Sequence, residues 1–273
     1  MEGYIYDYRL GYIRDGCALT GFDVYGGDNA PNGRIVALGG YTTPGQVRGG
    51  KTWAECLYDK LYGKYQILSG CTDGYSSAQI LIMFLREAIL LKPKLVICLS
   101  GFYNIAYKLG LIQNEADAEL LRTHPFATPG HLHFYKKIMS RFWLGNNEIF
   151  YGLENHSPAW ETWLRHMAEI NCVCDEFDIM FRAFLQPSIF SDHYVTGERE
   201  TAFLREHYVI SDEDIARYRG AFRREYAEVS ERIGDIGYIT DISGVFDACE
   251  DVYKDAYHVK DDFLPTLTEG MIL

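Results

Sequence analysis

Residues 34–43 read Arg-Ile-Val-Ala-Leu-Gly-Gly-Tyr-Thr-Thr, a short apolar run that ends in a glycine turn. A run of aliphatic and β-branched residues is typical of a strand buried on both faces of a parallel sheet. Glycines directly after such a strand allow a tight turn and leave backbone N–H groups uncovered. We therefore expect a buried strand at 34–38 and, at its carboxyl end, a turn that can approach a ligand closely.

Strands and helices are predicted to alternate from this strand to residue 100. Two capping-box patterns, Thr-x-x-Glu at 52–55 and Ser-x-x-Gln at 76–79, mark helix starts, and the second opens a helix expected to reach about Leu91. Further strands are expected at 65–68 and 95–100. This order is typical of right-handed βαβ units. It predicts an α/β fold, a three-layer α/β/α sandwich around a parallel sheet of about five strands, flavodoxin-like in plan.

The rest of the chain is expected to continue the same domain, which we place at residues 1–273. The further elements expected are a helix at 159–177, a strand at 179–186, a helix at 211–233 and a strand at 238–242. Ser211 is expected to cap the start of the 211–233 helix. Three segments interrupt the alternation: an irregular lead-in at 1–33 and insertions at about 110–158 and 188–210. We expect the first insertion to cover the edge of the sheet at which ligands bind.

The composition restricts the classes of partner. The chain has 273 residues, of which 48% are hydrophobic, and a formal net charge of −12. An acidic chain disfavours binding to a phosphate backbone, so no nucleic-acid partner is expected. The longest apolar stretch, residues 80–91, is interrupted by Arg86 and Glu87 and is too short to span a bilayer. The oligomeric state is left open by the sequence.

The cysteines and histidines form no metal-binding pattern. Cys172 and Cys174, the only close pair among seven cysteines, have no second pair or nearby histidine to complete a zinc site. His131 and His133 also lack carboxylate or cysteine neighbours in the sequence. We expect no metal and no cofactor. Scattered cysteines and the absence of a recognisable secretory signal favour a cytoplasmic protein.

Small and polar residues follow several predicted strands. They occupy residues 39–43, 73–76 and 100–104, and the pair Asp255 and His258 follows the last predicted strand. In an open parallel sheet, ligands bind outside the carboxyl ends of the strands, so these turns are expected to meet. A histidine oriented by a carboxylate is a suitable general base. The pattern therefore predicts a catalytic or binding site at this edge of the sheet.

Four of these segments, taken in order, resemble the sequence blocks of the SGNH/GDSL hydrolase superfamily. The superfamily has Gly-Asp-Ser or Gly-Gly-Ser-Thr-Thr after its first strand, a glycine after its second, Gly-x-Asn-Asp after its third, and Asp-x-x-His near its end. The corresponding segments here are 39–43, 73–77, 101–104 and 255–258. The resemblance covers roughly residues 30–270.

The resemblance implies a role for each matching residue. His258 would be the base, Asp255 would orient it, and Gly74 would supply an oxyanion-hole N–H. The residues implied in substrate binding are Gly40, Thr42, Tyr75 and Tyr257. The resemblance further implies an SGNH-hydrolase fold and an esterase, deacetylase or acyltransferase acting on acylated carbohydrate. The Gly-Gly-Ser-Thr-Thr subgroup often occurs with bacterial surface-polysaccharide genes, so the partner implied is a small-molecule or glycan acyl ester.

Two positions depart from the superfamily pattern. Tyr41 stands where the nucleophilic serine belongs, and strict register puts Tyr103 at the oxyanion asparagine and Asn104 at the following aspartate. A backbone shift could still bring Asn104 to the oxyanion hole. Tyr41 could serve as the nucleophile, Thr42 or Thr43 could replace it, or Tyr41 could simply fill the site. In the last case the chain is a catalytically inactive pseudoenzyme that binds a glycan or a partner protein.

Overall fold

The computed structural model describes residues 4–7, 11–14, 22–40, 51–72, 74–109, 111, 158–191, 193–207 and 211–271. Several sequence-based expectations lie outside these residues: those for Tyr41, Thr42, Thr43, Asp73, His131 and His133, and for nearly all of the first insertion.

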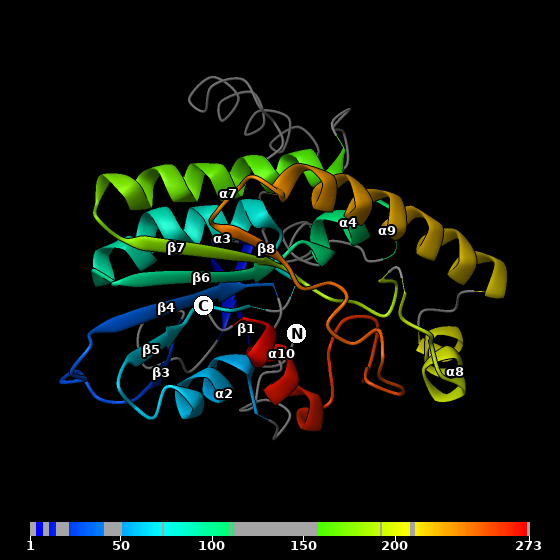
Figure 1. The fold of residues 1–273 in the computed structure, drawn as a ribbon, viewed down its shortest axis with the longest axis horizontal. Helices are drawn as coiled ribbons and strands as arrows, with labels where there is room; N and C mark the ends of the chain where they lie inside the picture. The colour runs from blue at the N-terminus through cyan, green and yellow to red at the C-terminus, as the bar shows by residue number, and fades with distance from the viewer. Residues whose placement is uncertain are drawn as a thin grey trace.

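The centre of the fold is a six-stranded sheet in the described part of the chain, with strand order β3-β5-β4-β6-β7-β8 (Figure 1). The strands are β3 (Asp23–Tyr25), β4 (Arg34–Gly39), β5 (Gln66–Ser69), β6 (Leu95–Ser100), β7 (Met180–Leu185) and β8 (Ile239–Asp241). Along the sheet order from β5 through β4, β6 and β7 to β8, each strand runs parallel to the next. Their order is the flavodoxin order, as predicted.

The predicted irregular lead-in contains regular structure, so that interpretation is wrong in part. Strand β3 pairs antiparallel with β5 and extends the sheet by one edge strand. A separate two-stranded antiparallel hairpin joins β1 (Tyr4–Asp7) to β2 (Gly11–Arg14). Strands of three or four residues are too short to show a period in the sequence, and tertiary pairing decides them.

Helices cover both faces of the sheet (Figure 1). On one face lie α2 (Trp53–Lys60) and α10 (Leu264–Gly270), which contact each other. On the other face, α7 (Ala159–Glu176) contacts α3 (Ser77–Met83), α4 (Phe102–Lys108) and α9 (Asp212–Ile233). A further helix, α8 (Glu198–His207), lies beyond the carboxyl ends of the strands. The three predicted layers are present.

The predicted helix starts are formed by the expected side chains. The Thr52 hydroxyl accepts a hydrogen bond of 3.0 Å from the Glu55 backbone N–H at the start of α2. At the start of α9 the Ser211 hydroxyl accepts one of 3.1 Å from the Asp214 N–H. Each cap satisfies an N–H that the helix itself leaves without an acceptor. Local sequence chemistry therefore fixes where these helices begin.

The helix that begins at Ser77 changes its hydrogen-bonding pattern along its length. After α3 it continues as a π-helical turn at Phe84–Ala88 and a 3₁₀ turn at Ile89–Leu91. It ends at Lys92, which adopts a left-handed conformation with φ of 49°. The sequence predicted one helix over this range, so its extent is confirmed while its uniform α geometry is not.

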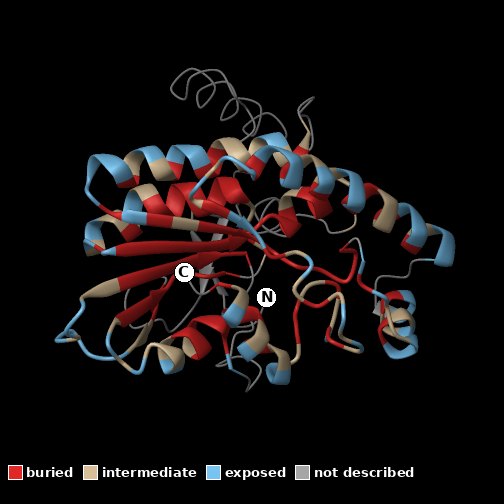
Figure 2. Cartoon of the chain, in the orientation of Figure 1, coloured by how far each residue is buried: buried red, intermediate tan, exposed pale blue. Residues whose placement is uncertain are grey.

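The pairing of β4 with β6 leaves no room for a side chain at Gly39. Both strands are buried almost throughout (Figure 2). Gly39 pairs with Leu99 across them, and a Cβ on Gly39 would come closer to the Leu99 carbonyl oxygen than real Cβ atoms do. Glycine at this position is therefore a steric requirement, and the glycine turn seen in the sequence has a packing cause as well as a chemical one.

Gly39→Ala should destabilise the protein by about 2–3 kcal/mol, because the added methyl forces the β4 and β6 backbones apart. Gly27→Ala is the matched control, since a Cβ there has no heavy atom within 4 Å, and we expect a change within about 0.5 kcal/mol. Urea unfolding followed by circular dichroism measures both. Equal effects of the two substitutions would contradict the close approach of the strands.

Candidate functional site

The candidate site lies where the strand order reverses. From β4 the chain passes to β5 on one side and returns to β6 on the other, which makes the carboxyl ends of β4 and β6 the switch point of the sheet. This switch point is where ligands bind in open α/β sheets. Gly40 follows β4, and Gly101, with a φ of 119°, follows β6 and begins the turn into α4.

Asp255 and His258 form a hydrogen-bonded pair in the turn of a small hairpin. The Asp255 Oδ2 lies 2.6 Å from the His258 Nδ1. The other carboxylate oxygen accepts hydrogen bonds from the backbone N–H groups of His258, at 2.8 Å, and of Tyr257, at 3.0 Å. The spacing of three residues lets one carboxylate bind the backbone and the ring together. The hydrogen bond expected between these two side chains is present.

Burial and hydrogen bonding act in opposite directions on Asp255. Its side chain is 12% exposed and that of His258 is 5% exposed. Burial raises the pKa of Asp255, but the charge of His258 and the hydrogen bonds from His258 and Tyr257 together outweigh it, so the pKa lies below its ordinary value. Asp255 is therefore ionised at neutral pH. An ionised carboxylate only accepts hydrogen bonds, so Nδ1 of His258 carries the proton between them.

A row of aromatic rings connects this pair to the glycine turn. The ring of Tyr257 lies 4.2 Å from the His258 imidazole and 4.9 Å from the ring of Tyr103, measured between centroids. A Cβ on Gly40 would lie 2.6 Å from the Tyr103 ring. Each residue thus contacts the next across the carboxyl edge of the sheet, in the order His258, Tyr257, Tyr103 and Gly40. Four residues proposed from three separate sequence blocks come together in the fold.

The turn after β5 joins the same cluster. A Cβ on Gly40 would also clash with the carbonyl oxygen of Tyr75. Gly74 has a φ of 82°, a left-handed conformation that favours glycine. Its carbonyl accepts a hydrogen bond from the Tyr107 hydroxyl, and the Tyr107 ring lies 5.6 Å from that of Tyr103. The described parts of all four sequence blocks therefore lie at one edge of the sheet.

Asn104 is held away from the oxyanion role that one reading of the sequence gave it. Its Oδ1 accepts a hydrogen bond of 3.0 Å from the Ser77 N–H, and its Nδ2 donates one of 2.7 Å to the Ser77 hydroxyl. The structure thus follows strict register: Asn104 binds the first turn of α3, and Tyr103 stands beside Gly40. For Asn104 to hold an oxyanion, its carboxamide would have to leave Ser77.

Sequence reasoning missed three residues that support this arrangement. They are Ser77 and His166, joined by a hydrogen bond of 2.8 Å between the Ser77 Oγ and the His166 Nδ1, and Tyr107. His166 is buried on the inward face of α7. A polar residue on the apolar face of the predicted 159–177 helix was the available signal, because buried polar groups are hydrogen-bonded. Tyr107 gave no comparable signal.

Neither a metal centre nor a membrane span is found in the part of the chain that the structure describes. No group of three or more histidine, cysteine or acidic side chains is placed to hold a metal ion among the described residues. None of the described helices is long and apolar enough to cross a bilayer. Cys174 is buried in the core, whereas Cys172 is exposed, so the close cysteine pair of the sequence points in two directions.

No family model matches the chain, and no curated protein matches it. Several solved structures resemble it over most of its length. An acetyl xylan esterase is 12% identical, covering 87% of this chain and 97% of its own, with a TM-score of 0.47. A GDSL-like lipase described as putative, from Parabacteroides merdae ATCC 43184, is 13% identical, covering 87% and 92%, also with a TM-score of 0.47. An acetylxylan esterase from Geobacillus stearothermophilus is 9% identical, covering 87% and 91%, with a TM-score of 0.44.

The three neighbours are described as two acetyl xylan esterases and one GDSL-like lipase. Their identities of 9–13% and TM-scores below 0.5 are too low to transfer an activity or a substrate. What this chain does therefore has to be argued from its own residues.

Replacing Asp255 by asparagine should reduce stability in a pH-dependent way. A carboxylate whose pKa is lowered on folding stabilises the protein above its unfolded pKa of about 3.9, and that contribution is lost as the pH falls through the folded pKa. We expect Asp255→Asn to lower the free energy of unfolding by about 2 kcal/mol near neutral pH. The deficit should shrink below about pH 4.

Denaturant unfolding from pH 3 to 7 measures this difference, with exposed Asp262→Asn as the control. A deficit that stays constant across the whole range would show that the Asp255 carboxylate gains nothing from its folded environment.

Proposed function

We propose that this protein is an SGNH-type acyl-ester hydrolase or acyltransferase that uses His258 as its general base. The observation that carries the proposal is the 2.6 Å hydrogen bond between His258 and Asp255, formed at the switch point of the sheet. With the proton fixed on Nδ1, a neutral imidazole has its basic lone pair on Nε2. That is the arrangement in which histidine takes a proton from a hydroxyl nucleophile.

Tyr41 is the nucleophile in this proposal. Nε2 of His258 takes the phenolic proton as the tyrosine oxygen bonds to the acyl carbon, and the departing sugar oxygen receives that proton when the ester bond breaks. Water, or a second sugar hydroxyl, then attacks the acyl-tyrosine, giving a carboxylic acid or a new ester and returning the proton to Tyr41. A phenol has a pKa of about 10, so it requires the neighbouring base to react at neutral pH.

The oxyanion hole is proposed to consist of the backbone N–H groups of Tyr41 and Gly74. The third donor of the superfamily pattern is missing, because Tyr103 stands at the asparagine position and Asn104 is bound to Ser77. Each missing donor costs about 10²–10³ in rate. We therefore expect slow turnover, because the missing donor and the tyrosine nucleophile both lower the rate.

The proposed substrate is an acylated carbohydrate, with surface polysaccharide or its precursors as the biological source. The site offers aromatic rings from Tyr75, Tyr103 and Tyr257, of which Tyr257 is partly exposed. A partly exposed ring presents a flat apolar face suited to a sugar ring. Gly40 and Thr42 are proposed to contact the same ligand from the turn after β4.

One observation favours a second function, that of a binding protein without turnover. The Tyr103 ring is 2% exposed and fills the space beside Gly40, where the superfamily pattern would place a hydrogen-bond donor. A buried ring there excludes water and takes up the space that an amide donor would need. In this alternative the chain binds a glycan or a partner protein through the same edge of the sheet.

His258→Ala should lower the rate of hydrolysis of p-nitrophenyl acetate and of acetylated xylose by about 10²-fold or more, because a positioned general base contributes that much. His193→Ala, which changes an exposed histidine outside the Asp255–His258 pair, should leave the rate unchanged. A wild-type rate no higher than that of His258→Ala would favour the binding protein.

Tyr41→Ser combined with Tyr103→Asn should raise ester hydrolysis by about 10²-fold or more over the wild type, since it restores a short hydroxyl and an oxyanion donor together. Tyr41→Ser alone should give part of this gain. NMR of the His258 ring verifies that the Asp255 hydrogen bond persists. A folded double variant that keeps this bond and hydrolyses none of a panel of acetylated sugars would show that the site serves binding.

A further inference from the structure

Asp255 and His258 are carried by a short hairpin at residues 252–260, called here the dyad hairpin. Its arms are joined by hydrogen bonds from the Lys260 N–H to the Val252 carbonyl, at 2.9 Å, and from the Lys254 N–H to the His258 carbonyl, at 2.7 Å. An isolated two-stranded hairpin is only marginally stable. Where the dyad stands relative to the glycine turn therefore depends on what fixes the base of this hairpin.

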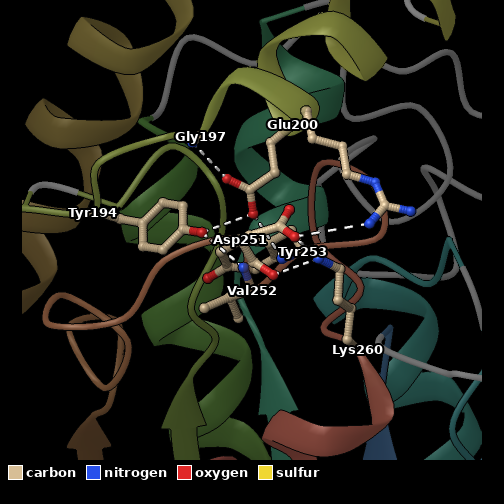
Figure 3. Close-up of polar contacts among 8 residues, drawn as sticks. Tyr194, Gly197, Glu200, Asp251, Val252, Tyr253 and Lys260 are labelled. Atoms are coloured by element: carbon tan, nitrogen blue, oxygen red, sulfur yellow. Dashed lines mark hydrogen bonds and ion pairs between the residues drawn. The ribbon is translucent and has the colours of Figure 1, made fainter.

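A buried carboxylate from another part of the chain binds that base (Figure 3). Glu200, only 3% exposed, lies in the first turn of α8. Its Oε1 accepts hydrogen bonds of 2.7 Å from both the Tyr194 hydroxyl and the Tyr253 N–H. Its Oε2 accepts one of 2.9 Å from the Gly197 N–H. Glu200 thus ties α8 and the loop before it to the first arm of the dyad hairpin.

Tyr194 completes this attachment. Its hydroxyl donates to Glu200 and accepts a hydrogen bond of 3.0 Å from the Val252 N–H. Its ring packs edge-to-face against that of Tyr253, with centroids 5.0 Å apart. Burial raises the pKa of Tyr194, and the bond to Glu200 raises it further, so the hydroxyl keeps its proton for Glu200. Two successive backbone N–H groups of the hairpin therefore donate hydrogen bonds to Tyr194 and Glu200.

A second, more exposed attachment lies next to it. Lys260 forms an ion pair of 2.6 Å with Asp251 (Figure 3). Arg199 reaches the same carboxylate at 3.9 Å. The Asp251 and Arg199 side chains are 43% and 82% exposed. Exposed ion pairs are screened by solvent and contribute little. The buried pair is the attachment able to fix position.

We propose that Glu200 and Tyr194 are positioning residues, which hold the dyad hairpin so that His258 faces the glycine turn. The inference rests on the proposed function for its purpose, but its test needs no substrate. It gives the segment at 188–210, which the sequence presented only as an insertion, a defined role.

Glutamine cannot take the place of Glu200. All the donors that the described residues present to this carboxylate are uncharged N–H or O–H groups, and both carboxylate oxygens accept. A carboxamide would turn its NH₂ group toward a donor in either orientation, leaving buried polar groups unpaired. Tyr194→Phe is the milder change, because it removes only the hydroxyl and leaves the ring in place.

The test follows the Nδ1 proton of His258 by NMR in ¹⁵N-labelled protein, under conditions where circular dichroism shows every variant to be folded. Tyr194→Phe should raise the solvent-exchange rate of this proton about tenfold, because the hairpin opens more often when two hydrogen bonds are lost. Glu200→Gln should raise it further. Tyr25→Phe, which removes a hydroxyl bonded to Thr52 and not to the hairpin, should leave it within about twofold.

Unchanged exchange of the His258 proton in a folded Tyr194→Phe protein would overturn the proposal, even if its melting temperature fell, because that result describes a structural anchor only. If Glu200→Gln does not fold, Tyr194→Phe alone decides. Failure of the ester assays would remove the proposed function without touching this result, since the proton exchange reports the dyad in the free protein.

Discussion

The close approach of β4 and β6 is the constraint on which the rest of the site depends. The two strands are neighbours in the sheet but not in the sequence, and Gly39 lies directly against the Leu99 carbonyl. No side chain at Gly39 separates the carboxyl ends of these strands, and Gly40 and Gly101 follow them at the same edge of the sheet. Gly40 then contacts Tyr75 and Tyr103, which come from the other two turns. A bulkier residue at Gly39 would push β4 away from β6 and so move Gly40 away from Tyr75 and Tyr103.

From that point the site is built mainly of aromatic rings, with one polar pair at its end. Tyr103 and Tyr257 lie between Gly40 and His258, and Phe102 packs against Tyr257 at 4.8 Å between centroids. Rings exclude water and lower the local dielectric, which strengthens the interaction between Asp255 and His258. The same surroundings would make an uncompensated charge expensive. Here the carboxylate is compensated by three hydrogen bonds.

Features set by local chemistry could be predicted from the sequence, and features set by distant contacts could not. The buried strand after Gly33, the helix caps at Thr52 and Ser211, and the bond between Asp255 and His258 depend on residues close in sequence. Strand β3 was missed because three residues show no period. Whether Tyr103 or Asn104 stands beside Gly40 was undecided, because the answer lies in the contacts of Asn104 with Ser77, 27 residues away in sequence. The role of Glu200 could not be predicted either, because its partner Tyr253 lies 53 residues away in sequence.

The way the dyad hairpin is attached bears on what the site is for. Tyr103 fits beside Gly40 without disturbing the fold, so the fold does not require an oxyanion donor at that position. Nor does it require a buried carboxylate under the hairpin, because an apolar contact of similar volume would anchor two strands at a lower desolvation cost. An apolar contact, however, tolerates sliding, whereas the bonds of Glu200 to Tyr194, Gly197 and Tyr253 are directional. Directional anchoring is of use where a side chain has to be held within a fraction of an ångström, as an acid–base pair does. These directional bonds are why we propose a positioning role for Glu200 and Tyr194 rather than a purely structural one.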